Sequence, residues 1–287
     1  MTTPPTKRTK RAQRGAAAIM VVLMVLLGLL TLLTFRLDRK QPEMDADKKT
    51  ALALVQAKEV LLGRAAANGN PGSLPCPDTN NDGSSAGAIC PVHVGRIPYR
   101  TLAAAQLTDG AAETIWYMVD DAYWDHGQKI NTTTPPTLTV NGLPVVAALF
   151  SSGAPLAGQN RIDTGLANSP SNDPSNYLED YTNPVITLPR SSTYNDRILT
   201  ITPRELFSVV TFRIARELAA QNLLAYTAAP DLSGLIKPQV WIDNNWDAAV
   251  DAASNVTTTT ITLKFTGCAI VYTITGQRAV QRNPSAC

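Results

Sequence analysis

The stretch that decides the fold is RGAAAIMVVLMVLLGLLTLLTF, residues 14–35. No charged residue occurs from Ala16 to Phe35, and five basic residues but no acid occupy the first fifteen positions. Twenty residues at about 1.5 Å each reach about 30 Å, the thickness of a bilayer's hydrocarbon core. The basic flank favours a cytoplasmic N-terminus. The sequence therefore predicts a transmembrane helix over 16–35, and Leu33-Thr34-Phe35 offers no small-residue site for a secretory peptidase.

Residues 13–22, QRGAAAIMVV, resemble the start of a type IV prepilin, in which a short basic leader and a Gly precede an apolar helix. In that family a peptidase on the cytoplasmic side cuts after the Gly and methylates the new N-terminus. The resemblance therefore implies cleavage between Gly15 and Ala16. Most pilins have an aromatic first residue and a Glu fifth, whereas this chain has Ala16 and Met20. The missing Glu resembles the tip-located minor pilins and the K-type minor pseudopilin of type II secretion.

The resemblance implies a structural subunit of a type IV pilus or type II secretion filament, a minor pilin or pseudopilin without enzymatic turnover. Met20 cannot accept the bond that the family's Glu accepts from a neighbouring N-terminus, which implies a place at the filament tip. The implied partners are other pilin or pseudopilin subunits, a prepilin peptidase and the inner membrane, with the globular domain in the periplasm. The alternative is a single-pass periplasmic ligand-binding protein or enzyme behind an ordinary signal anchor.

Charge and histidine content argue against several function classes. Without the five basic leader residues, 20 basic groups face 23 acidic ones, so no specific nucleic-acid partner is expected. The chain has two histidines, His93 and His126, and neither lies in a metal or nucleophile motif. The adjacent acids Asp120 and Asp121 could serve a glycosidase, but such pairs are usually solvated. An enzyme is therefore not predicted.

Four cysteines follow the apolar run, on the side predicted to be exported, where disulfides form. Three pairings are possible, and we expect Cys76–Cys90 and Cys268–Cys287 because each closes a short loop. Zinc is not expected, because neither pair has the two-to-four-residue spacing of zinc ligands.

The segment from Asp78 through Asn80 to Asp82, followed by Gly83, has the pattern of the first half of a calcium loop. The twelfth position is Ile89 instead of a bidentate Glu. A complete site would need an acid from elsewhere, for example Asp109 or Glu113. Calcium is therefore the one cofactor considered, and the alternative is a turn built by Asp and Asn side chains, which needs no metal.

The expected fold class is α+β, with a long N-terminal transmembrane and stalk helix followed by a mixed globular domain with antiparallel strands. The expected organisation is a basic leader over 1–15, the transmembrane helix over 16–35, a stalk helix over 36–68 that Pro42 allows to bend, and a periplasmic domain over 69–287. Within that domain the sequence predicts a buried strand over 113–119, a hairpin at Asn141-Gly142, an irregular insertion over about 151–200, a capped helix over 203–226 and strands over 256–265 and 269–274.

Further resemblance to pseudopilins lies in three places: residues 74–78, residues 95–100, and an Asp109-Gly110 turn followed by Ile115-Trp116-Tyr117. The resemblance therefore covers about the first 125 residues. No motif of that family can be matched to the rest of the chain.

Overall fold

A computed structural model describes residues 11–87, 89–125, 127, 129–166, 168–179, 193–221, 232–257, 260–275 and 280–283. The side chains of 11–18, 32–40 and 268–269 lie outside this description. The chain divides into two compact units, Met1–Lys48 and Lys49–Cys287, and each is described by itself.

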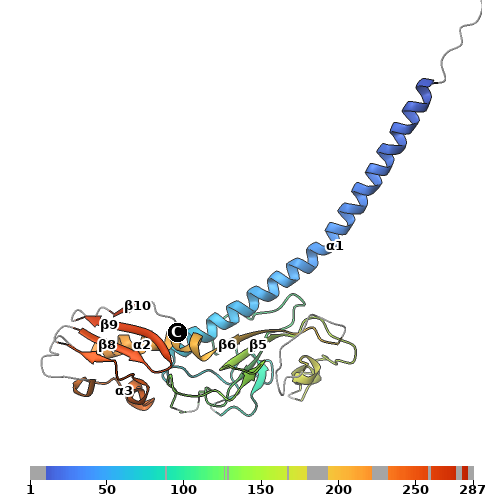
Figure 1. Cartoon of the computed structure of the whole chain (residues 1–287). Helices are drawn as coiled ribbons and strands as arrows, with labels where there is room; N and C mark the ends of the chain where they lie inside the picture. Colours follow the sequence, from blue (N-terminus) through green and yellow to red (C-terminus); the bar gives the residue numbers. More distant parts are fainter. Residues whose placement is uncertain are drawn as a thin grey trace, which may run out of the picture. The chain divides into compact units, whose positions relative to one another are not determined.

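Helix α1 (Arg11–Ala67) begins in the first unit and has Pro42 in its interior (Figure 1). Among the residues that the structure describes, no helix is both long enough and apolar enough to cross a membrane. The transmembrane helix in the predicted fold class is therefore wrong.

The second unit contains a mixed α/β domain with antiparallel sheets. Its first sheet has the order β1-β2-β5-β6 and its second the order β10-β9-β8-β7, while β3 and β4 form a separate hairpin. The strands are β1 (Val94–Arg96), β2 (Trp116–Val119), β3 (Thr139–Val140), β4 (Leu143–Pro144), β5 (Ala147–Ser151), β6 (Arg197–Ile201), β7 (Asn255–Val256), β8 (Thr260–Phe265), β9 (Cys268–Thr275) and β10 (Val280–Asn283). The other helices are α2 (Pro203–Gln221) and α3 (Gln239–Asp243), with 3-10 turns at η1 (Pro170–Asn172), η2 (Pro174–Asn176), η4 (Leu232–Gly234) and η5 (Trp246–Ala249).

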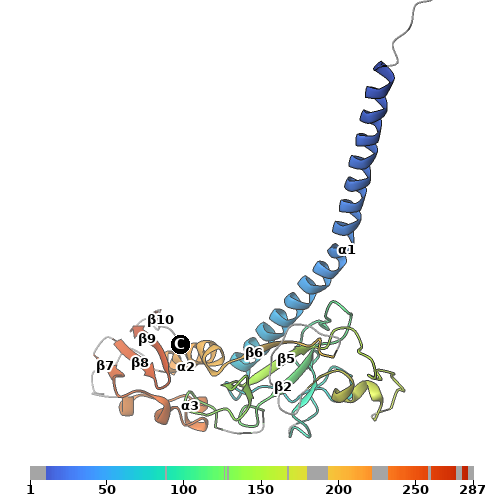
Figure 2. The ribbon, with the colours of Figure 1, turned by 45° about the vertical axis from the view of Figure 1, so that its right-hand side comes forward.

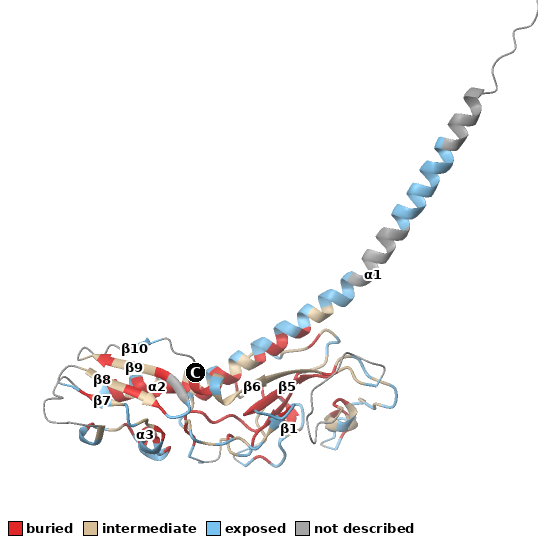
Figure 3. Cartoon of the chain, viewed as in Figure 1, coloured by how far each residue is buried: buried red, intermediate tan, exposed pale blue. Residues whose placement is uncertain are grey.

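The main core of this unit joins the end of α1, α2 and one face of each sheet. Side chains at helical spacing in the end of α1 are buried, among them Leu54, Leu61 and Leu62, as the sequence indicates. Val55, next to Leu54 in the sequence, is about half exposed. Helix α2 packs against β9 and β10, and Figures 1 and 2 show it beside that sheet. Figure 3 shows the buried residues gathered in this unit.

The start of α2 confirms the capping box. The Glu205 carboxylate accepts hydrogen bonds from the Thr202 amide and hydroxyl, each at 2.9 Å, and the Glu205 amide donates to Thr202 Oγ1 at 3.3 Å. Each partner thus satisfies a backbone donor that the helix leaves free. Apolar side chains at helical spacing are buried along the helix: Phe207, Val210, Ile214 and Leu218. The residues beyond Gln221 lie outside the described part of the chain.

Two predicted turns are present. Asn141 and Gly142 join β3 to β4 with φ of 52° and 73°, the left-handed conformations of a type I′ hairpin. Gly267, with φ of 74°, lies in the turn from β8 to β9. The elements β1, β6, β10 and α3 were not predicted, because they are short and lack the alternation or length that marks a strand or helix.

The insertion is better ordered than predicted up to residue 179. Its 3-10 turns η1 and η2 position Tyr177 and Leu178 against the face of the first sheet that turns away from the main core. These two side chains close a second hydrophobic cluster with Trp116, Met118, Val140, Val145, Ala148 and Phe150. The insertion therefore serves as a covering layer for that face of the sheet.

Candidate functional site

A cavity of about 770 Å³ lies beside strand β1 and is here named the β1 pocket. Its apolar lining includes Val92, Val94, Met118 and Leu138, and Asn172 and Pro174 of the insertion also line it. Val94 and Leu138 pack against the second hydrophobic cluster, to which Met118 belongs. The pocket is therefore continuous with the face of the sheet that the insertion covers.

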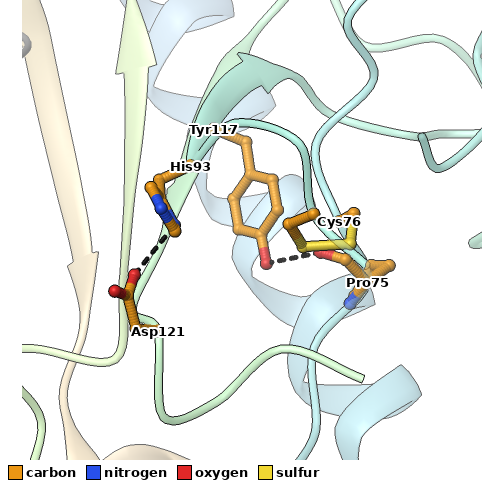
Figure 4. Close-up of a disulfide and its surroundings, with 6 residues drawn as sticks. Pro75, Cys76, His93, Tyr117 and Asp121 are labelled. Atoms are coloured by element: carbon orange, nitrogen blue, oxygen red, sulfur yellow. Dashed lines mark hydrogen bonds and ion pairs between the residues drawn. A yellow bond between two sulfur atoms is a disulfide. The ribbon is translucent and has the colours of Figure 1, made fainter. Parts of the chain in front are cut away.

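His93 and Asp121 form the polar rim of the β1 pocket. His93 Nδ1 lies 2.8 Å from Asp121 Oδ1 (Figure 4). The centre of the imidazole ring lies 5.3 Å from the centre of the Trp124 ring. Both side chains are open to solvent, with 46% and 67% of their surface exposed. His93 lies immediately before the first residue of β1. His126 lies outside the described residues.

The neighbouring Asp120 differs from Asp121, because it is buried and its carboxylate accepts several hydrogen bonds. Its carboxylate accepts hydrogen bonds from the amides of Ala122, Thr137 and Leu138 and from the Thr137 hydroxyl, at 2.5–2.9 Å. These bonds hold the start of the β3–β4 hairpin. The two adjacent acids therefore do not act as a solvated pair, and Asp120 serves the fold.

A disulfide joins Cys76 to Cys90, which is the pairing expected for the first two cysteines. It lies beside the Tyr117 hydroxyl, which donates to the Pro75 carbonyl at 3.2 Å (Figure 4). Burial raises the pKa of Tyr117 well above its ordinary value, so this hydroxyl remains a donor. The Cys268 side chain and all of Cys287 lie outside the described residues.

The calcium-like loop is folded by its own hydrogen bonds. Asp78 is buried, and its two carboxylate oxygens accept from the Asn80 amide at 3.0 Å and the Gly83 amide at 2.7 Å. Asp82 accepts from the Ser84 amide at 2.7 Å and from the Asn80 side chain at 3.0 Å. The Ser84 amide is the main cause that lowers the pKa of Asp82.

The residues considered as completing ligands are engaged elsewhere or exposed. Asp109 accepts from Ser151 and Gly153, and Glu113 pairs with Arg161. Ile89 is largely exposed. Within the described residues no group of three or more His, Cys, Asp or Glu side chains could hold a metal ion. The hydrogen bonds of Asp78 and Asp82 form a turn built by Asp and Asn side chains. Calcium binding to this turn stays a prediction.

The insertion is fastened by Arg96, whose importance the sequence does not reveal. This guanidinium is buried, lies 4.7 Å from the centre of the Trp116 ring and 5.3 Å from that of Tyr177, and donates to the Ser171 carbonyl and to Asn172 Oδ1. A cation on two aromatic faces gains electrostatic energy that partly replaces hydration. Because Arg96 belongs to β1, it connects the edge of the sheet to the insertion.

A pair of acids lies where the insertion returns to the sheet. Asp196 has 7% of its surface exposed, and its Oδ2 accepts from the Glu179 amide at 3.0 Å. Its Oδ1 and Glu179 Oε2 are buried and have no hydrogen-bond partner among the described residues. Burial and the adjacent Glu179 carboxylate raise the pKa of Asp196 to about 8. One proton is therefore retained by the pair at neutral pH. No spacing motif in the sequence could have brought these two acids together.

The prepilin-like cleavage residues Gly15 and Ala16 lie within the backbone of α1, and their side chains are outside the described set. Comparisons with protein-family models, curated proteins and solved structures gave no match for this chain. No family is therefore assigned, and the prepilin resemblance rests on the residues that carry it.

Proposed function

We propose that the chain is a structural subunit, similar to a minor pilin or pseudopilin, that assembles with other subunits through the first part of α1. One observation carries this proposal. The eleven large apolar side chains within residues 19–30 are each 54–72% exposed. A helix that is apolar on every face is normally buried against other apolar surface. In an assembly, the matching helices of neighbouring subunits would supply that surface.

The disulfide supports export of the second unit. A bond between Cys76 and Cys90 persists in an oxidising compartment such as the periplasm and is rare in the cytosol. Export and filament assembly are compatible with each other. The work proposed is packing, and the Asp120 carboxylate is committed to the Thr137 and Leu138 amides of the fold.

The maturation step tests the pilin-like part of the proposal. In cells with an active prepilin peptidase, mass spectrometry should find a chain that starts at an N-methylated Ala16. A Gly15→Val variant should keep the full leader, because the peptidase of the resembled family cuts after Gly. An intact Met1 start of the unaltered chain in those cells would overturn this maturation.

The assembly step needs a separate test. Residues 16–35 are replaced by an unrelated apolar helix of equal length, and incorporation into isolated filaments is measured. The proposal predicts that incorporation is lost while the Cys76–Cys90 disulfide still forms. Retained incorporation would favour the alternative of a ligand-binding protein whose helix serves as an interchangeable anchor.

A further inference from the structure

Strand β1 has one edge that pairs with β2 and an opposite edge that the rest of the unit covers in part. His93 O accepts from the Val119 amide, and the Ile97 amide donates to Ile115 O. These two bonds fix the antiparallel alternation, in which residues 93, 95 and 97 bond to β2 and residues 94 and 96 point their amides and carbonyls outward.

At Arg96 the outward amide and carbonyl of β1 are already hydrogen-bonded to the backbone of Asp78. The Arg96 amide donates to Asp78 O at 2.7 Å, and the Asp78 amide donates to Arg96 O at 2.8 Å. The Asp78 side chain then turns the chain by accepting from the Asn80 and Gly83 amides. This turn carries the chain away from β1 after a single bridge.

The outward groups of Val94 are consequently left open. Among the described residues, none forms a hydrogen bond with the Val94 amide or carbonyl. Val94, Val92 and Thr79 all line the β1 pocket, so this open edge borders the cavity. An unpaired donor and acceptor on one edge residue form the template to which another strand adds.

The chemistry of the pocket restricts what can occupy it. Val92, Val94, Met118 and Leu138 give it apolar walls that suit a Val, Ile or Leu side chain. The charged lining residues among those described are Asp120, which is buried and saturated, and Asp121, which is exposed beside His93. A ligand that carries a Lys or Arg near its apolar residue would therefore meet a complementary carboxylate.

We propose that the open edge of β1 at Val94 binds an extended peptide segment of a partner protein, which adds to the sheet as a further strand. The segment places one aliphatic side chain in the β1 pocket and one basic side chain beside Asp121. Backbone pairing at Val94 supplies the docking, and the pocket selects the side chain. This inference goes beyond the proposed filament packing through α1, since it concerns a different surface.

Binding is measured with the full chain and a fluorescein-labelled peptide, Ser-Lys-Val-Thr-Val-Thr-Lys-Ser, by fluorescence anisotropy. Val94→Pro removes the outward amide without touching a bond to β2, since the Val94 amide points away from it. We expect the Kd for the peptide to be at least tenfold higher for Val94→Pro. For Val94→Ala, which keeps the amide, the Kd should change by less than threefold. Asp121→Asn should weaken binding a few-fold and reduce its dependence on salt.

A second measurement leaves the protein unchanged, in case Val94→Pro disturbs the fold. Two peptides are compared, one N-methylated at its odd positions and one at its even positions. Alternate amides of an added strand point toward the sheet, so one of the two peptides should lose at least tenfold in affinity and the other should not. Equal affinity of both, unaltered binding to a folded Val94→Pro variant, or no saturable binding of the unmodified peptide up to millimolar concentration would each overturn the proposal.

Discussion

Helix α1 contains two apolar stretches of opposite character. Within residues 19–30 the large apolar side chains are all more than half exposed, whereas Ala57, Leu61 and Ala65 in the second unit have no exposed surface. The later stretch is amphipathic, and Lys58 and Glu59 occupy its other faces. The earlier stretch has no polar face in its described part apart from Thr31, whose hydroxyl bonds back to the Leu27 and Gly28 carbonyls.

This difference separates apolar surface that the chain covers with its own core from apolar surface that a partner would have to cover. The later stretch has its apolar stripe covered by the chain's own core, so its residues stabilise the fold. The earlier stretch contributes apolar surface that folding of the single chain does not cover. Substitutions in the two stretches should therefore change different measurements.

The largest expected effect comes from matched truncations in the two stretches. Leu61→Ala should lower the free energy of unfolding by about 3 kcal/mol, since it opens a cavity in a packed core. Leu26→Ala should change it by less than about 0.5 kcal/mol and instead reduce incorporation into assemblies. Urea denaturation followed by fluorescence of the buried Trp116, Trp241 and Trp246 measures the first quantity. Equal destabilisation by both variants would contradict the comparison.

The pair of acids Glu179 and Asp196 allows the same comparison for polar groups, because each has a buried oxygen without a hydrogen-bond partner among the described residues. The pKa of Asp196 is raised to about 8, so the folded state binds this proton more tightly than the unfolded state does. That contribution to stability is therefore present at low pH and is lost as pH rises from about 4 through 8. Asp196→Asn should flatten this pH dependence and raise stability at pH 9 by about 1–3 kcal/mol.

Thermal denaturation between pH 6 and pH 9 measures this effect, with Asp163→Asn as the matched control. Asp163 is an acid of the same insertion whose pKa is lowered, mainly by the Gly165 amide, so it is ionised throughout that range. The control should leave the pH profile unchanged. A steeper loss of stability in Asp196→Asn than in the unaltered chain would exclude a shared proton.

A smaller effect concerns the polar contact of the later stretch. Lys58 Nζ donates to Glu205 Oε1 at 2.5 Å and to the Thr200 carbonyl at 2.8 Å, which connects α1 to β6 and α2. Lys58→Met should cost about 1 kcal/mol of unfolding free energy, because it removes two hydrogen bonds from a partly buried site. The exposed Lys49→Met serves as the control and should be neutral within about 0.5 kcal/mol in the same denaturation experiment.

The smallest expected effect is that of calcium on the Asp78 loop. An ion held by Asp78, Asn80 and Asp82 with a millimolar Kd would add about 1 kcal/mol at several millimolar calcium. The melting temperature should then rise by a few degrees with calcium and not with magnesium, and Asp82→Ala should abolish the rise. An unchanged melting temperature would mean that the loop is a turn, since the hydrogen bonds of Asp78 already satisfy it without an ion.

The parts of the fold that the sequence predicted are those with a local cause. The capped start of α2 at Thr202 and Glu205 and the Asn141-Gly142 turn follow from hydrogen bonds within a few residues. The transmembrane helix was predicted from apolarity alone, and the described part of α1 does not bear it out.

The candidate sites depend on residues far apart in the sequence. Arg96 meets Tyr177, and Glu179 meets Asp196, because the insertion folds back over the sheet. The edge at Val94 is open because the chain pairs with β1 at Asp78 and Arg96 only, and the turn after Asp78 then leads it away. Such pairings leave no local pattern, so they could not be read from composition or spacing.

The close approach at Gly95 has a consequence for recognising relatives of this chain. A Cβ at position 95 would lie 2.4 Å from the Asp78 carbonyl oxygen, and one at Gly83 would lie 2.5 Å from the Tyr99 ring. Together with the disulfide and the Asp78 carboxylate, these glycines define the signature Cys-x-Asp-x4-Gly-x6-Cys-x4-Gly over residues 76–95. Divergent sequences that share this strand edge should retain that spacing after most of their other residues have changed.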